Sequence, residues 1–340
     1  MKIMKIGVIS TAHIHTHGFL KQLANHESAA IGGIWDDNPE RGQRFASEFD
    51  ASFHSNIDEL LEMEAIDGWM ICAENTRHLQ HLRRLLPLGK PVFCEKPLVT
   101  DIEELKEVGQ LLEKHRTPLS SGYFQPFVAP LQGVREVIEN GALGTITRVR
   151  FRMAHHAAYG GWFDSEALRW FTQPALSGGG AFMDLGSHAI HLMRTFFGPI
   201  KEVLAVIENH SGRYPDVDDY GTCQLRFESG LLGVVEAAWT QTGGEASGLE
   251  VVGSEATLYH GDSGYVVAAA KSKESAPCPV ESGKEIPNRV PRLLGMIEGT
   301  VPEQILQNDL AAIFDTVSIM AAAYASSRSG QWEKVASDGL

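Results

Sequence analysis

Three residues in this sequence carry side chains that can together handle a proton on a hydroxyl group. Lys96 follows a short apolar run and precedes Pro97, so its ammonium group is expected at the end of a buried strand, presented to a ligand. Asp184 and His188 are four residues apart in a glycine-rich segment, a spacing that places two side chains on one face of a helix. An imidazole, with an ordinary pKa of about 6.5, suits the removal of a hydroxyl proton. These residues predict acid–base chemistry.

Length and composition restrict the class of protein. A chain of 340 residues exceeds one typical domain, so we expect two. The formal net charge of −14 argues against nucleic acid as a partner. Neither a signal peptide nor an uninterrupted apolar run of about 18 residues is evident, so we expect no membrane span. The four cysteines are far apart and show no CxxC pairing, which favours reduced thiols and a cytoplasmic location.

The first third of the chain alternates short apolar strands with helical patterns. Strands are predicted at 5–10, 31–35, 66–73 and 92–95, and the segment Thr100–Glu103 has the form of a capping box that opens a helix. Such alternation is typical of a parallel sheet covered by helices on both faces.

The pattern changes period after about residue 141. Apolar residues alternate with Arg148, Arg150 and Arg152, as on a half-buried strand, and this pattern continues over 200–269 as a mostly antiparallel sheet. The other predicted elements are a helix at 126–140, a hairpin turn at Ser229–Gly230, a final amphipathic helix through 310–324 and an exposed loop at 271–289.

The segments 91–98 and 178–188 together resemble the Gfo/Idh/MocA family, named for glucose-fructose oxidoreductase, inositol dehydrogenase and a rhizopine-catabolism protein. The resemblance covers about residues 4–330. It implies an α/β protein with an N-terminal NAD-binding Rossmann domain at 1–122. A C-terminal α/β domain at 123–340, built on a large, mostly antiparallel open sheet, would bind the substrate and form the oligomer. The implied activity is NAD-dependent oxidoreduction of a secondary hydroxyl of a sugar, inositol or related polyol.

The same resemblance assigns roles at the reacting centre. It implies that His188 is the base, that Lys96 hydrogen-bonds the reacting oxygen and relays its proton, and that Asp184 orients the substrate or the imidazole. Asn75 and His78 match the Asn-x-x-His segment of the family near the nicotinamide, with Glu95 and Lys96 as further cofactor contacts.

The loop after the first strand departs from the family pattern. Ser10, Ala12 and His15 stand where three glycines usually allow the approach of the cofactor pyrophosphate. We nevertheless expect Ser10, Ala12, His13 and Ile14 to contact the cofactor, although more weakly. Asp36 ends the second strand. A carboxylate at this position accepts hydrogen bonds from the ribose hydroxyls and repels a 2′-phosphate, which favours NAD over NADP. The alternative reading of Asp36 is a polar turn before the next helix.

Histidine is enriched at several of these positions. His191 extends the face of Asp184 and His188, so a metal site on these three residues is one hypothesis, and hydrogen bonding to sugar hydroxyls is the other, which we prefer. The residues predicted to contact the substrate are Tyr123, His156, Trp170 and His191. The aromatic residues Tyr123, Tyr159, Trp162 and Trp170 form either a wall against a sugar ring or part of the core.

Two further functions remain open. A redox-neutral glycosidase or lyase would use the same cofactor only transiently, and a non-catalytic sugar-sensing regulator would explain the altered loop. An open sheet with one uncovered face is expected to expose a large apolar surface, which predicts a homodimer or homotetramer that packs through residues 145–269.

Overall fold

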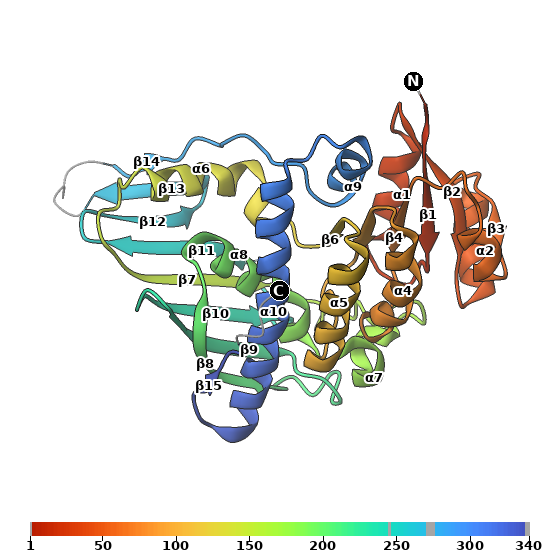
Figure 1. The fold of residues 1–340 in the computed structure, drawn as a ribbon. Coiled ribbons are helices and arrows are strands. Elements are labelled where there is room, and N and C mark those ends of the chain that lie inside the picture. The colour runs from red at the N-terminus through yellow and green to blue at the C-terminus, as the bar shows by residue number, and fades with distance from the viewer. Residues whose placement is uncertain (1, 244–245, 270–275, 337–340) are drawn as a thin grey trace.

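The computed structural model describes residues 2–243, 246–269 and 276–336 (Figure 1). Its N-terminal sheet has six strands, all parallel, in the order β3-β2-β1-β4-β5-β6, which confirms the predicted parallel sheet. The strands are β1 (Met4–Ile9), β2 (Ala29–Trp35), β3 (Phe53–His54), β4 (Gly68–Ile71), β5 (Val92–Cys94) and β6 (Leu119–Ser121). The core positions of β1, β4 and β5 are almost fully buried, as both faces of a covered parallel sheet must be.

Helices connect these strands and cover the sheet. They are α1 (Thr16–Ala24), α2 (Pro39–Glu48), α3 (Ile57–Leu61), α4 (His78–Leu85) and α5 (Ile102–His115). The predicted capping box before α5 was placed one residue too early. The N-cap is Asp101, whose carboxylate accepts the amide protons of Glu103 and Glu104, because Asp101 rather than Thr100 has the extended backbone of a cap.

The second sheet has nine strands in the order β14-β13-β12-β11-β7-β10-β9-β8-β15. Every neighbouring pair is antiparallel except β7 and β10, which confirms a mostly antiparallel sheet. The predicted hairpin lies between β9 and β10, with Gly230 at φ 88° in its turn. The strands are β7 (Ile146–Ala154), β8 (Ile200–Glu208), β9 (Tyr220–Phe227), β10 (Leu232–Ala238), β11 (Ala246–Gly253), β12 (Ala256–Gly261), β13 (Gly264–Ala269), β14 (Cys278–Pro279) and β15 (Glu333–Lys334).

Five further helices belong to this half of the chain, namely α6 (Ala129–Glu139), α7 (Pro174–Ser177), α8 (Ser187–Phe197), α9 (Arg289–Glu298) and α10 (Glu303–Ser329). The predicted loop at 271–289 is partly wrong, because Cys278 and Pro279 pair with β13 as β14. Its residues 271–275 lie outside the described part of the chain.

The last two helices tie the two sheets together. Helix α9 packs on α1, β5 and β6 of the first sheet, and its Leu293 and Leu294 join the core around Met4 and Phe19. Helix α10 contacts α5 and β6 on one side and α8 and β8 on the other (Figure 1). Its length and composition would suffice to cross a membrane, but 61% of its most apolar stretch is buried inside the protein, as in a core helix. The C-terminal segment therefore contributes to both halves.

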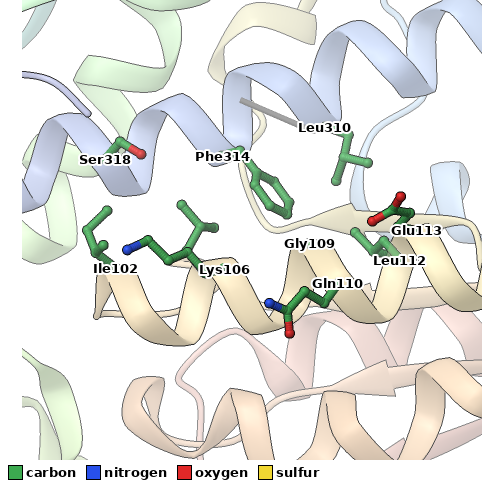
Figure 2. Close-up of a pocket in the computed structure, with 10 residues that line it drawn as sticks. Ile102, Lys106, Gly109, Gln110, Leu112, Glu113, Leu310, Phe314 and Ser318 are labelled. Atoms are coloured by element: carbon green, nitrogen blue, oxygen red, sulfur yellow. The ribbon is translucent and has the colours of Figure 1, made fainter. Parts of the chain in front are cut away.

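A surface cavity of about 640 Å³ lies between α5 and α10 (Figure 2). Apolar side chains from both helices line it, among them Leu105, Leu112, Leu310 and Phe314. It lies on the junction between the two helices, apart from the carboxyl edge of the first sheet where the candidate site residues gather.

The outward face of the second sheet differs from the apolar surface that we expected. Arg148, Arg150 and Arg152 of β7 are exposed there. Strand pairing places Glu250 of β11 beside Arg150 and Glu236 of β10 beside Arg152, so both signs of charge alternate across the face. A face of this kind can match a second copy of itself about a two-fold axis.

We predict a homo-oligomer that packs through this face. Arg150→Glu places a second negative charge beside Glu250 and should shift the protein toward monomer in light scattering at micromolar concentration. Lys21→Glu, an exposed change on α1, is the matched control. A natural chain that is already monomeric would contradict the interface.

Candidate active site

The candidate site lies at the carboxyl edge of the first sheet. The loop after β1, the segment after β4 and Lys96 after β5 all emerge at this edge because these strands are parallel neighbours. From the boundary between β1 and β4, successive strands are added in opposite directions. In such sheets, ligands bind outside the carboxyl ends of the strands at this boundary. The second half of the chain meets this edge with a π-helical turn at Phe182–Gly186.

Lys96 and Asp184 form an ion pair between the two halves. Lys96 Nζ lies 2.5 Å from Asp184 Oδ1, and the Lys96 side chain is only 3% exposed. The other carboxylate oxygen accepts the indole N–H of Trp239 at 3.0 Å. Burial alone would raise the pKa of Asp184, but the Lys96 ammonium and these hydrogen bonds hold it far below its ordinary value. Asp184 is therefore ionised and forms an ion pair with the Lys96 ammonium group.

A close backbone contact positions the turn that carries Asp184. Asp218 accepts the amide protons of Gly180 at 2.8 Å and Phe182 at 2.7 Å, and Tyr324 donates its hydroxyl to the same carboxylate at 2.9 Å. A Cβ at Gly180 would lie 1.8 Å from the Asp218 carbonyl oxygen, so only glycine fits. We expected Asp184 and His188 on one face of a regular helix. The structure instead places Asp184 in a π turn and His188 in α8, which follows it. Such π turns are frequent at functional sites.

His188 enters the site from the first turn of α8. Its ring lies edge-on to Tyr123 and Phe124, at centroid distances of 5.5 and 5.2 Å. Burial, with the nearby Lys96 charge, lowers the pKa of His188 well below its ordinary value, so the imidazole is neutral. Its Nδ1 has no hydrogen-bond partner within the described residues. A neutral ring with an available lone pair can accept a proton.

These groups line one cavity of about 230 Å³. Its lining residues are His13, Ile14, His15, Lys96, Phe124, Met153, Ala154, His155, Trp162, Phe163, Phe171, Asp184, Leu185 and His188. The volume is below the roughly 300–1,000 Å³ of pockets for drug-sized ligands. The cavity therefore suits a small polar ligand held against aromatic side chains.

The predicted substrate contacts are placed differently from our expectation. Tyr123 is buried and stacks on His191 at 4.4 Å, and His191 Nε2 lies 3.3 Å from Asp309, so this pair belongs to the interior. Trp170 is buried and donates its N–H to the Ala12 carbonyl at 3.2 Å. His156 is half-buried against Trp162, at the margin of the site. None of the four lines the cavity.

The aromatic wall comes from other residues. Of the four aromatic residues considered for it, Trp162 alone lines the cavity, joined by Phe124, Phe163 and Phe171. No pattern in the sequence separates these phenylalanines from core residues. The structure also does not bring Asp184 and His191 together as the hypothesis of a metal site requires. Asp184 faces Lys96, whereas His191 faces Asp309.

Asn75 and His78 connect chain segments. The Asn75 amide donates to the Ser177 carbonyl at 2.8 Å. The His78 ring pairs with the carbonyls of Pro97 at 2.8 Å and Ala73 at 3.2 Å. Both side chains thus hold the segments after β4, after β5 and before the π turn in place.

Comparison with known proteins assigns the family. Residues 4–123 match the family model described as "Oxidoreductase family, NAD-binding Rossmann fold", and residues 131–259 match "GFO/IDH/MocA C-terminal domain". The chain belongs to the Gfo/Idh/MocA family. Its 2,7-anhydro-N-acetylneuraminate hydratase relative from Escherichia coli K12 is 26% identical over 216 residues, which are 62% of this chain and 55% of the hydratase. This chain therefore matches little more than half the length of that relative.

Other members cover more of the chain. Myo-inositol 2-dehydrogenase of Thermotoga maritima is 25% identical over 267 residues, 75% of either chain. Levoglucosan dehydrogenase, solved with NADH and levoglucosan, superposes with a TM-score of 0.81 at 20% identity, covering 98% of this chain and 100% of its own. The structural likeness confirms the fold of both halves.

The loop after β1 keeps the turn of the family. Ser10 adopts φ 64°, the left-handed conformation that favours glycine, which is the residue usual at this position. Asp36 also keeps its expected place directly after β2. Its two oxygens, however, already accept protons from Thr11, Asn38 and Arg41 at 2.6–3.1 Å.

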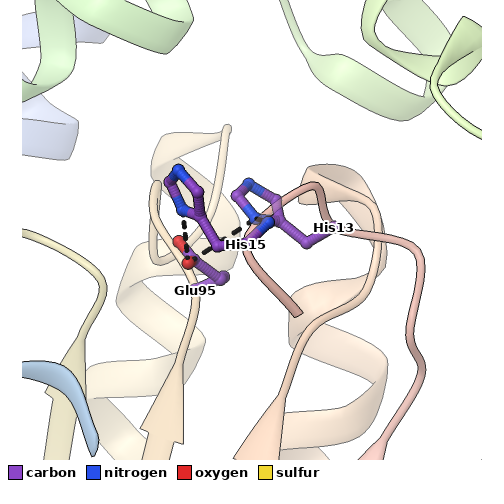
Figure 3. Close-up of side chains that lie close together, drawn as sticks. All are labelled: His13, His15 and Glu95. Atoms are coloured by element: carbon purple, nitrogen blue, oxygen red, sulfur yellow. Dashed lines mark hydrogen bonds and ion pairs between the residues drawn. The ribbon is translucent and has the colours of Figure 1, made fainter. Parts of the chain in front are cut away.

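Several backbone donors of the same loop are also paired. The Ser10 amide donates to the Trp35 carbonyl at 2.7 Å, and the Thr11 amide donates to the Asp36 carboxylate at 2.7 Å. The His13 amide donates to the Cys72 carbonyl at 2.9 Å. The His15 amide donates to His13 Nδ1 at 3.3 Å, and the Thr16 amide donates to the His13 carbonyl at 3.0 Å. The imidazoles of His13 and His15 stand over Glu95 (Figure 3). A dinucleotide bound in the family's manner would therefore have to displace some of these contacts.

We predict that NAD binds weakly and that His15→Gly strengthens the binding, because the change removes an imidazole from the third glycine position. Calorimetric titration should show a dissociation constant at least ten-fold lower, about 1.4 kcal/mol. His17→Gly, at an exposed histidine paired with Glu48, serves as the control. Equal NAD affinity of the natural chain and His15→Gly would contradict the steric argument.

We also predict that Gly180→Ala lowers the unfolding temperature by several degrees, because its methyl group would overlap the Asp218 carbonyl. Gly18→Ala is the matched control, since a Cβ there meets no atom within 4 Å. Calorimetric scans of both variants test the difference, and equal melting temperatures would show that the contact is not rigid.

Proposed function

We propose that this protein is an enzyme of the oxidoreductase family that acts on a secondary hydroxyl group of a sugar, inositol or related polyol. One observation carries the proposal. A lysine paired with a carboxylate and a neutral histidine, contributed by different halves of the chain, line a single small cavity. Structural ion pairs do not require a base with a free lone pair beside them, whereas proton transfer does.

His188, Lys96 and Asp184 have different roles in the proposed reaction. His188, neutral through burial, accepts the hydroxyl proton. Lys96 supports the oxygen as negative charge develops on it, because its ammonium lies in a site largely removed from solvent. Asp184 holds Lys96 in place through their ion pair. Trp162 and Phe171 contribute apolar ring atoms to the wall of the cavity, against which the carbon side of the ligand can pack.

NAD is the hydride acceptor that the family implies, and NAD rather than NADP is the form we propose for this chain. Three carboxylates, Asp36, Asp37 and Glu74, surround the two guanidinium groups of Arg41 and Arg77. The cluster carries a net charge of 2 − 3 = −1, which disfavours a 2′-phosphate. We expect an affinity for NAD about ten-fold or more above that for NADP.

A redox-neutral reaction at the same carbon is the second candidate. The Escherichia coli relative is itself named as a hydratase. In this form the three site residues move protons and no net hydride transfer occurs.

One experiment separates these forms. The protein is incubated with a panel of sugars, inositols and sugar acids in D₂O, with and without NAD. NADH formation supports oxidoreduction, and deuterium incorporation or water addition without NADH supports the redox-neutral form. The absence of any turnover across the panel would favour a sugar-sensing regulator and contradict the enzyme.

The sharpest prediction concerns Lys96 and His188. Lys96→Met removes the charge at similar length, and His188→Ala removes the base. Each should lower kcat by about 10²-fold or more, and the double variant should lose much less than the product of both effects, since both groups serve one transition state.

Lys114→Met and His210→Ala are the matched controls, because both side chains are exposed and distant from the cavity. Steady-state kinetics on the substrate identified above give the comparison. Near natural turnover in either single variant would remove that residue from the mechanism, and strictly multiplicative losses would show that the two residues act independently.

A further inference from the structure

His13, His15 and Glu95 form a compact group of donor atoms at the carboxyl edge of the first sheet (Figure 3). His15 Nδ1 lies 3.0 Å and His13 Nδ1 lies 3.5 Å from Glu95 Oε1. All the ligand atoms lie within 4.8 Å of one another. A tetrahedral ion with bonds of about 2.0–2.2 Å separates its ligand atoms by roughly 3.3–3.5 Å, so small side-chain movements suffice for coordination.

A backbone hydrogen bond fixes the position of the Glu95 carboxylate. Glu95 is fully buried, and its Oε2 accepts the Lys96 amide proton at 2.8 Å, which leaves Oε1 toward the two imidazoles. A Cβ at Gly122 would lie 2.3 Å from Oε2, so the neighbouring strand end leaves room for the carboxylate only because it has glycine there. Metal-binding carboxylates are typically fixed by such an outer hydrogen bond.

His13 is the buried histidine of this group. Its side chain is 1% exposed, and its Nε2 has no hydrogen-bond partner in the part of the chain that the structure describes. The ring nitrogen that lies toward Glu95 is Nδ1, which also accepts the His15 amide proton at 3.3 Å.

We propose that His13, His15 and Glu95 bind a divalent transition-metal ion at the mouth of the active-site cavity. Two imidazoles and one carboxylate suit ions such as Zn²⁺, Fe²⁺ or Co²⁺ and leave coordination positions open. Those positions face the ligand, because His13 and His15 line the same cavity as Lys96 and His188. The site lies on the loop whose glycines are replaced, so it stands where the family places its cofactor.

The ion adds charge that the site otherwise lacks. Lys96 and Asp184 neutralise each other, and Glu95 offsets only one of the two positive charges of the ion. The remaining charge attracts an oxygen that is anionic or becomes so. The role of the ion rests on the proposed function and is to hold neighbouring oxygens of a polyol or sugar acid, acting as a Lewis acid on the oxygen that loses its proton.

The test begins with the full-length protein as purified. Elemental analysis should find a transition metal, and after removal of metal by a chelator, Co²⁺ should titrate to a single ion per chain by visible absorption. Binding should raise the melting temperature of the metal-free protein, because the ion binds the folded chain. A chain that shows no saturable Co²⁺ absorption overturns the site.

The variants separate the ligands from neighbouring histidines. His15→Gln and Glu95→Gln should each weaken Co²⁺ binding at least ten-fold, whereas His17→Gln, an exposed histidine two residues further on, should leave it unchanged. His15 is 36% exposed, so circular dichroism of His15→Gln should match the natural protein even if the buried Glu95→Gln variant does not fold. Equal Co²⁺ affinity of His15→Gln and His17→Gln overturns the proposal.

The outcome is distinguishable from failure of the proposed function. Stoichiometric Co²⁺ binding that depends on His15, without turnover of any sugar or polyol, upholds the metal site and contradicts the enzyme. Full turnover with NAD in the metal-free protein, with no Co²⁺ binding, upholds the enzyme and overturns the metal site.

Discussion

The ion pair between Lys96 and Asp184 is the interaction on which the arrangement of the site depends. It joins residues 88 positions apart, one from each half of the chain, in a region that is largely removed from water. Burying two charges costs several kcal/mol per ion, so the pair is tolerated only where further hydrogen bonds compensate it. Trp239 supplies one of these bonds to Asp184. The two buried charges therefore compensate each other only while both halves remain docked.

The docking is maintained by helices that return from the end of the chain. Helix α9 fills one side of the first sheet, and α10 packs on both halves. Close backbone contacts then fix the site at short range. The Asp218 carboxylate anchors the turn that carries Asp184, and Gly180 permits the approach. Rigid elements on both sides keep Lys96 and His188 at one cavity, as a preorganised site requires.

The loop after β1 shows how a family scaffold can keep its shape while its chemistry changes. Ser10 has the left-handed turn, and several amides of the loop bind within the protein. His13 and His15 fill the released space and meet Glu95 from the end of β5. A loop that elsewhere serves an anion through backbone donors here presents neutral nitrogen and carboxylate oxygen atoms, the donor types that a cation prefers.

The sequence by itself determined the two sheets and named the candidates for the central residues. Period-two and helical patterns, with the turn at Gly230, are local properties, so the parallel first sheet and the mostly antiparallel second sheet could be predicted. Lys96 and His188 were recognisable because their flanking segments resemble those of the family. The role of Tyr123, Trp170 and His191 was not, since an aromatic ring in a core and one on a cavity wall have the same local pattern.

Tertiary structure alone decided which polar groups meet. His15 and Glu95 are 80 positions apart, and they become neighbours because parallel strands end at one edge of the sheet. The engagement of Asp36 by Arg41, the interior position of His191 beside Asp309 and the π turn at Asp184 likewise arise from packing between distant segments. Sequence patterns record the periodicity of each element, but not which side chains satisfy one another once the elements are assembled.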